Sequence, residues 1–158
     1  MTLTYWTDVH LMTDLPDTAI ASALAAALRV SPQRVAVASS GSPQVSDAAL
    51  RPGLAALVQR EDIRWDAPDT RWPFELRVAL NERTPAHPEM ILVALAEALG
   101  VPILTDFASD DQDTFRVILP TGEALARFAD DDADIVYEPG DAERLAPYLP
   151  KDAFPLAS

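Results

Sequence analysis

Residues 74–107 read FELRVALNERTPAHPEMILVALAEALGVPILTDF, and this stretch decides the fold that the sequence predicts. Its opening residues alternate polar with apolar side chains, as a strand with one solvated face requires. Pro88 suits the first turn of a helix, where a missing backbone N–H has no cost, and Gly100 suits the left-handed residue that ends one. A short apolar run at 101–104 follows. The stretch therefore predicts a strand, a helix and a second strand.

The predicted helix carries one apolar stripe. Its members recur at the three- and four-residue spacing that places side chains on one helical face. They are Ile91, Leu95, Ala98 and Leu99. This face is expected to cover a sheet.

A similar unit precedes this one. The chain has a predicted strand at 2–10, a helix capped by Asp14, and a strand at 35–38. Shifting this unit by 71 positions aligns its apolar residues with those of the later one. The pattern predicts two similar halves, 1–66 and 74–146, each with a pair of parallel strands joined by a right-handed crossover.

The remaining segments carry weaker signals. We expect a helix over 47–59 that Pro52 and Gly53 interrupt, and a linker between the halves. Later come a hairpin with a turn at Thr121-Gly122, a last strand, a short helix and an irregular tail. Their predicted ranges are 62–65 for a short strand, 66–73 for the linker, 114–119 and 124–128 for the hairpin, 135–137 for the last strand, 141–145 for the helix and 147–158 for the tail.

The fold class that these elements predict is α+β, in one domain over 1–158. One sheet would hold strands from both halves, with the two main helices on one face. A ferredoxin-like layering is the nearest simple arrangement. The acidic hairpin region would lie at one end or edge.

Composition narrows the classes of function. The chain has no cysteine, which excludes disulfides, thiol nucleophiles and cysteine-ligated metals. No run approaches the length of a membrane helix and the N-terminus lacks the pattern of a signal peptide, so a cytoplasmic protein without a membrane partner is expected. The net charge is −13, and such a chain is a poor ligand for nucleic acid but a good one for a basic protein. No cofactor is predicted, and the oligomeric state is left open.

The negative charge is concentrated in one part of the chain. From Asp106 to Glu143 there are twelve acidic and two basic residues, a net of −10 out of −13. The region is either a solvated face that keeps the protein soluble or an acidic docking surface. On the docking hypothesis, the partner-binding residues are Asp106, Asp110, Asp111, Asp113, Asp130, Asp131, Asp132 and Asp134.

The same aspartates permit other chemistry. Oxygen-rich loops bind Ca²⁺ or Mg²⁺, and a small metal-dependent hydrolase could use the Asp106–Asp113 loop with His10 or His87. The run from Asp130 lacks the glycine and the closing glutamate of an EF-hand. The chain contains no HExxH, no GxSxG and no Gly-rich phosphate loop. A structural subunit, or a homodimer that pairs a sheet edge, is a third possibility.

The aromatic residues and histidines also have two interpretations. Tyr5, Trp6, Trp65 and Trp72 could line a ligand cleft or an interface, but core packing is the commoner role. His10 is expected to be an ordinary residue at a strand end. His87 is expected at the start of the later helix.

One segment resembles a known class of protein. Residues 100–128, GVPILTDFASDDQDTFRVILPTGEALARF, combine a helix ending in Leu-Gly, a short strand with Asp106 and a hairpin with Thr121-Gly122. This arrangement resembles that of small bacterial immunity-type proteins, which bind and block interbacterial toxins. The resemblance implies a non-enzymatic inhibitor that neutralises a basic protein partner, and it assigns no catalytic residue.

Overall fold

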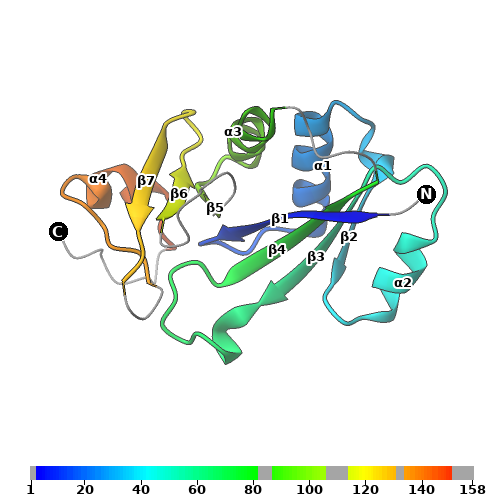
Figure 1. Ribbon diagram of the computed structural model, residues 1–158, viewed down its shortest axis with the longest axis horizontal. Coiled ribbons are helices and arrows are strands. Elements are labelled where there is room, and N and C mark those ends of the chain that lie inside the picture. Colours follow the sequence, from blue (N-terminus) through cyan, green and yellow to red (C-terminus); the bar gives the residue numbers. More distant parts are fainter. Residues whose placement is uncertain (1–2, 82–86, 106–113, 131–133, 151–158) are drawn as a thin grey trace.

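The protein is built around a single seven-stranded mixed sheet, and its class is α+β (Figure 1). The computed structural model describes residues 3–81, 87–105, 114–130 and 134–150. Across the sheet the strand order is β2-β3-β4-β1-β5-β6-β7. The pair β2–β3 is parallel, and the other neighbouring strands are antiparallel. The strands are β1 (Thr4–Leu11), β2 (Val35–Ser39), β3 (Ala56–Asp62), β4 (Phe74–Leu80), β5 (Ile103–Thr105), β6 (Thr114–Ile118) and β7 (Ala124–Phe128).

The described residues also form four α-helices and three short 3₁₀ turns, of which the last helix and the last turn follow β7. The α-helices are α1 (Asp17–Leu28), α2 (Pro43–Ala49), α3 (Pro88–Leu99) and α4 (Asp141–Leu145). The 3₁₀ turns are η1 (Pro32–Arg34), η2 (Ile63–Trp65) and η3 (Ala146–Tyr148).

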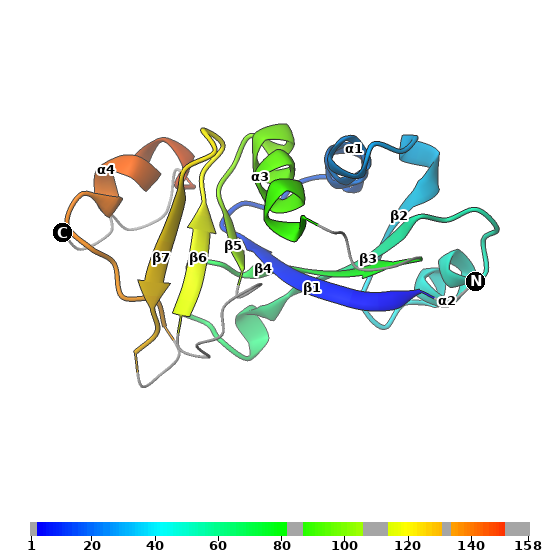
Figure 2. The same cartoon turned by 45° about the horizontal axis from the view of Figure 1, so that its top comes forward.

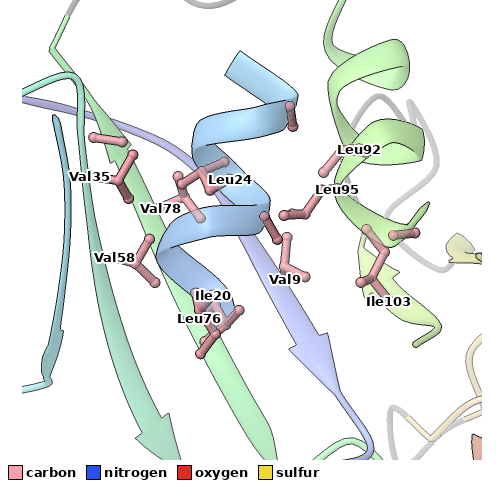
Figure 3. Close-up of a cluster of buried hydrophobic side chains, with 14 of the residues drawn as sticks. Val9, Ile20, Leu24, Val35, Val58, Leu76, Val78, Leu92, Leu95 and Ile103 are labelled. Atoms are coloured by element: carbon pink, nitrogen blue, oxygen red, sulfur yellow. The ribbon is translucent and has the colours of Figure 1, made fainter. Parts of the chain in front are cut away.

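Helices α1 and α3 lie side by side on one face of the sheet, as the sequence predicts (Figure 2). Beneath them is the main core, to which both helices and strands β1 to β5 contribute apolar side chains (Figure 3). Ile20 and Leu24 of α1 and Leu92 and Leu95 of α3 are all almost wholly buried. Burial of such side chains stabilises the fold by about 1.5–3 kcal/mol each.

The opposite face of the sheet is covered at its two ends. Near β2 and β3, helix α2 packs Ala48 against Ala36 and Leu57. Near β6 and β7, a second apolar cluster includes Leu145 of α4 and Trp72, which precedes β4. Packed layers thus lie on both faces of the sheet. The ferredoxin-like layering remains a prediction.

The two halves interleave, so the two strands of each predicted half run in the same direction but are not hydrogen-bonded neighbours. Strand β1 lies between β4 and β5, and β3 and β4 lie between β1 and β2. The one parallel pair in the sheet is β2–β3. The antiparallel ladder that joins β1 to β4 connects the halves directly.

The later part of the first half, residues 47–65, is the main error of secondary-structure prediction. The expected helix at 47–59 is a short helix, α2, followed by a turn and then β3. Pro52 and Gly53 lie in that turn, where Gly53 has a φ of 75°. The expected strand at 62–65 is the 3₁₀ turn η2. Of the two tryptophans near the linker, Trp72 is buried as expected, but Trp65 is exposed.

The boundaries of α3 agree with the prediction, but part of its apolar stripe does not. The helix begins at Pro88, directly after His87, and ends at Gly100, whose φ is 72°. Its fully buried residues include Leu92 and Ala96, whereas Ala98 is exposed. The buried face is therefore rotated from the predicted one.

Helix α1 differs from the prediction at its start. Asp14 lies before the helix and does not cap it, since Pro16 is the residue that precedes its first turn. The helix ends in a left-handed residue, as α3 does, but that residue is Arg29, with a φ of 59°.

The C-terminal region forms the predicted hairpin and short helix. Strands β6 and β7 pair antiparallel, and β7 lies at the edge of the sheet. The predicted strand at 135–137 is limited to a single bridge between Ala129 and Ile135. The predicted irregular tail begins with the 3₁₀ turn η3, and its residues 151–158 lie outside the described part of the chain.

Candidate functional site

Two of the eight predicted partner-binding aspartates can be placed. Asp130 and Asp134 are both exposed and lie directly after β7. The other six, namely Asp106, Asp110, Asp111, Asp113, Asp131 and Asp132, lie outside the described residues. Their proposed role therefore remains a prediction.

A tight set of hydrogen bonds holds Asp130 and Asp134 together. The backbone N–H of Asp134 donates to the Asp130 carboxylate at 2.9 Å, and the N–H of Asp130 donates to the Asp134 carbonyl at 2.8 Å. Beside them, the N–H of Val136 donates to the carbonyl of Phe128 at 2.8 Å. Residues 134–136 thus continue the ladder at the outer edge of β7.

Successive side chains along this ladder point alternately towards the second apolar cluster and away from it. Ile135 packs into the second apolar cluster, so its neighbours are directed away from that cluster. Phe128 and Val136 are 62% and 49% exposed. Two carboxylates and two large apolar side chains thus share one outward surface. We call Phe128, Asp130, Asp134 and Val136 the edge surface.

A buried ion pair supports the edge surface from behind. Arg127 donates through Nε and Nη2 to the two carboxylate oxygens of Asp141, at 2.8 and 2.6 Å. The two side chains are only 7% and 2% exposed. Asp141 also accepts the backbone N–H of Glu138 at 2.8 Å, and Arg127 donates to the Ala126 carbonyl at 2.6 Å. The pair therefore ties β7 to the start of α4.

This pair shifts the pKa of both groups. The hydrogen bonds from Arg127 lower the pKa of Asp141 below its usual value, against the opposing effect of burial. The same bonds raise the pKa of Arg127. Both groups are charged at neutral pH, and their hydrogen bonds link β7 beside Phe128 to the start of α4.

A second group of charged side chains lies on the central strands. His10 and Asp8 of β1 face Glu75 and Arg77 of β4 across the ladder. Glu75 is 3.9 Å from His10 and 3.6 Å from Arg77. Arg77 is also 3.6 Å from Asp8. The predicted role of His10 as a strand-end residue fits its position in β1, where it contacts a carboxylate.

The described residues form two adjoining clefts at one end of the strands. The first, about 370 Å³, lies where β1, β2 and β3 end and β4 begins. The second, about 510 Å³, continues from it towards the C-terminal segment. Asp14, Arg64 and Phe74 line both. We call the first hollow the strand-end cleft.

The arginines of the strand-end cleft are held by carboxylates. Arg60 donates to both Asp14 and Asp17 at the start of α1. Arg64 lies over the ring of Phe74, 5.3 Å from its centroid, and pairs with Asp62. The hydrogen bond from Arg64 is the main cause that lowers the pKa of Asp62. Sequence reasoning missed this cleft, because its lining residues come from five separate segments.

The structure also bears on the predictions about a metal site, a membrane helix and the aromatic residues. Within the described ranges, no three His, Cys, Asp or Glu side chains are grouped so that they could hold a metal ion. None of the helices in those ranges is long and apolar enough to span a bilayer. Trp6 and Trp72 are core residues, whereas Tyr5 and Trp65 are exposed. The proposed hydrolase loop, Asp106–Asp113, lies outside the described residues.

Comparison of this chain with known protein families, with curated proteins and with solved structures finds no match. The chemistry of the described surfaces is therefore the basis for the function proposed below.

Proposed function

We propose that this chain is a non-enzymatic acidic binding protein that recognises a basic protein partner through its edge surface. An inhibitor of immunity type, which blocks a basic toxin by covering it, is the specific form of this proposal. The observation that carries it is the edge surface itself. It combines an exposed aromatic side chain at the end of β7 with two exposed carboxylates that follow the strand.

Phe128 has the properties of an interface anchor. Aromatic side chains dominate binding energy when a partner buries them, and most of the Phe128 side chain is exposed. Its backbone is fixed by β6 on one side and by Val136 on the other, so little ordering would accompany binding. Rigid placement of this kind favours a specific partner over general adhesion.

The carboxylates supply the preference for a basic partner. Asp130 and Asp134 flank the apolar side chains and are exposed, as rim residues of an interface are. With a net charge of −13, the whole protein attracts cationic surfaces over a Debye length of about 8 Å at physiological salt. Exposed charges mainly raise the association rate, and the apolar anchor mainly slows dissociation.

The experiment is affinity capture of partners from host lysate by the tagged full-length protein, followed by kinetic measurement with the captured protein. Phe128→Ala is expected to weaken binding by about 2 kcal/mol or more, roughly thirtyfold, mostly through faster dissociation. Asp130→Asn with Asp134→Asn is expected to slow association and to reduce its salt dependence. Asparagine at 130 keeps the oxygen that accepts the Asp134 N–H.

Matched substitutions elsewhere provide the controls. Tyr5→Ala removes another exposed aromatic side chain, and Asp47→Asn removes another exposed carboxylate. Neither should change binding. A partner that binds the Phe128 variant and the double aspartate variant as tightly as the wild type would contradict the proposal. The metal-dependent hydrolase and the homodimer remain predictions without a described feature that favours them.

A further inference from the structure

The strand-end cleft lies where the chain diverges to the two faces of the sheet. Strands β1, β2 and β3 run in the same direction, because β4 is antiparallel to both β1 and β3. After β1 the chain passes to α1 on one face, and after β2 it passes to α2 on the other. Crevices at the ends of strands whose connections diverge are common ligand sites in α/β sheets.

The side chain of Arg64 shows that the lining of this cleft can bind a guanidinium group. Its guanidinium lies over the Phe74 ring and donates from Nε to Asp62 at 2.9 and 3.0 Å. Stacking on an aromatic face while bonding a carboxylate is the characteristic recognition of a guanidinium. The side chains of Arg64 and Asp62 are 55% and 42% exposed, so an incoming guanidinium can reach both the carboxylate and the ring from solvent.

The charge of the lining favours a cationic occupant. Four acidic residues line the cleft, with two arginines. Glu75 is only 16% exposed and is fixed on a central strand. Leu76 and Ile20 provide an apolar floor, against which the methylene stem of a long side chain can lie. Arginine satisfies both requirements, with an apolar stem and a planar cationic head.

We propose that the strand-end cleft binds an arginine side chain of the basic partner, which takes the place of the Arg64 guanidinium over Phe74. This proposal rests on the proposed function, because it names a contact that a basic partner makes. Arg64 moves into solvent when the partner arginine enters, and Asp62 exchanges one guanidinium for another. The cleft would then be a second contact, separate from the edge surface.

The test is an NMR titration of the ¹⁵N-labelled full chain with the peptide Ac-Gly-Arg-Gly-NH₂. Amide shifts are expected at Phe74, Ser40 and Leu15, which line the cleft. The matched peptide with citrulline keeps the shape but lacks the charge, and it should give no shifts there. A lysine peptide should bind more weakly, because an ammonium group lacks the planar face for stacking.

Two substitutions separate this proposal from general charge attraction. Arg64→Ala removes the internal competitor, so the arginine peptide should bind about threefold to tenfold more tightly. Asp62→Asn keeps an oxygen that can accept the Arg64 N–H but loses the charge, and binding should weaken. Arg51→Ala, which removes an arginine that bonds the Gln33 carbonyl instead, is the control and should leave affinity unchanged.

Unchanged or weaker binding by the Arg64 variant would overturn the inference, and so would equal binding of the citrulline peptide. Shifts confined to Asp130 and Asp134 would also overturn it, by placing the arginine on the edge surface instead. The proposed function fails separately, when a captured partner binds the Phe128 variant as tightly as the wild type. Circular dichroism of each variant checks that it is folded.

Discussion

Replacing Arg127 with alanine should destabilise the protein strongly, because the buried carboxylate of Asp141 loses the guanidinium to which it is hydrogen-bonded. Asp141 is 1% exposed, so water cannot replace the two lost hydrogen bonds. Breaking one partner of such a buried pair costs about 3–5 kcal/mol. That is a large share of the roughly 5–15 kcal/mol by which a domain of this kind is stable.

Two further variants provide stabilities with which that of Arg127→Ala can be compared. Arg144 also approaches Asp141, at 3.5 Å, but its side chain is 42% exposed. Arg144→Ala should therefore cost less than about 1 kcal/mol. Replacing Arg127 with methionine and Asp141 with leucine removes both charges together. That double variant should be more stable than Arg127→Ala, although the Glu138 N–H loses its acceptor.

The effect should depend on pH in a defined direction. Arg127 lowers the folded-state pKa of Asp141 below its unfolded value, so the stabilisation is present above that unfolded value, about 3.9, and is lost as pH falls through the folded pKa. In the Arg127 variant, burial without the cation favours protonated Asp141. The stability difference between wild type and variant should thus be largest at pH 7 and should narrow as the pH falls towards 4.

Urea unfolding followed by far-ultraviolet circular dichroism and tryptophan fluorescence measures these differences. Trp72 is a suitable reporter, since it is buried in the second apolar cluster together with Leu145 of α4, the helix that Asp141 begins. Its indole N–H donates to the Tyr137 hydroxyl at 3.1 Å. An Arg127→Ala cost no larger than that of Arg144→Ala would refute the reasoning. So would a difference that does not change between pH 7 and pH 4. If Arg127→Ala does not fold, Arg127→Lys keeps the charge but loses the bidentate fork, and should cost less.

Two further predictions concern the helices. Arg29 and Gly100 end α1 and α3 in the same left-handed conformation, so Arg29→Gly should stabilise the protein by up to about 1 kcal/mol, and Gly100→Ala should destabilise it by a similar amount. Effects of the same sign in urea unfolding would contradict this account. Leu95→Ala should cost about 2–5 kcal/mol, because Leu95 is 1% exposed in the core beneath α1 and α3. The same change at the exposed Met90 should cost far less, and similar costs at the two sites would show that the core is misplaced.

The elements that the sequence predicted well carry their own local signals. Helix α3 has a proline at its start and a glycine at its end, and the β6–β7 hairpin has Thr121-Gly122 at its turn. Strand β3 has no comparable signal. Its identity comes from pairing with β2 on one side and β4 on the other, which are contacts with distant parts of the chain.

The candidate site was predictable in its charge but not in its apolar part. Asp130 and Asp134 belong to an acidic run that is evident in the sequence. Phe128 ends an alternating strand, and a large apolar residue there is normally expected to be buried. Its exposure follows from the register of β7, in which Leu125 and Arg127 face the second cluster. Register depends on pairing across the sheet, so sequence patterns could not show it.

The position of β1 between β4 and β5 has a consequence for how the chain is made. Strand β1 leaves the ribosome well before its partners, residues 74–80 and 103–105, are synthesised. Until they appear, β1 has neither of its neighbours, and its apolar side chains lack most of their core. Contacts so distant in sequence make folding slow and leave strand edges open in the meantime. A nascent chain that ends before residue 105 therefore depends on chaperones more than one whose halves close independently.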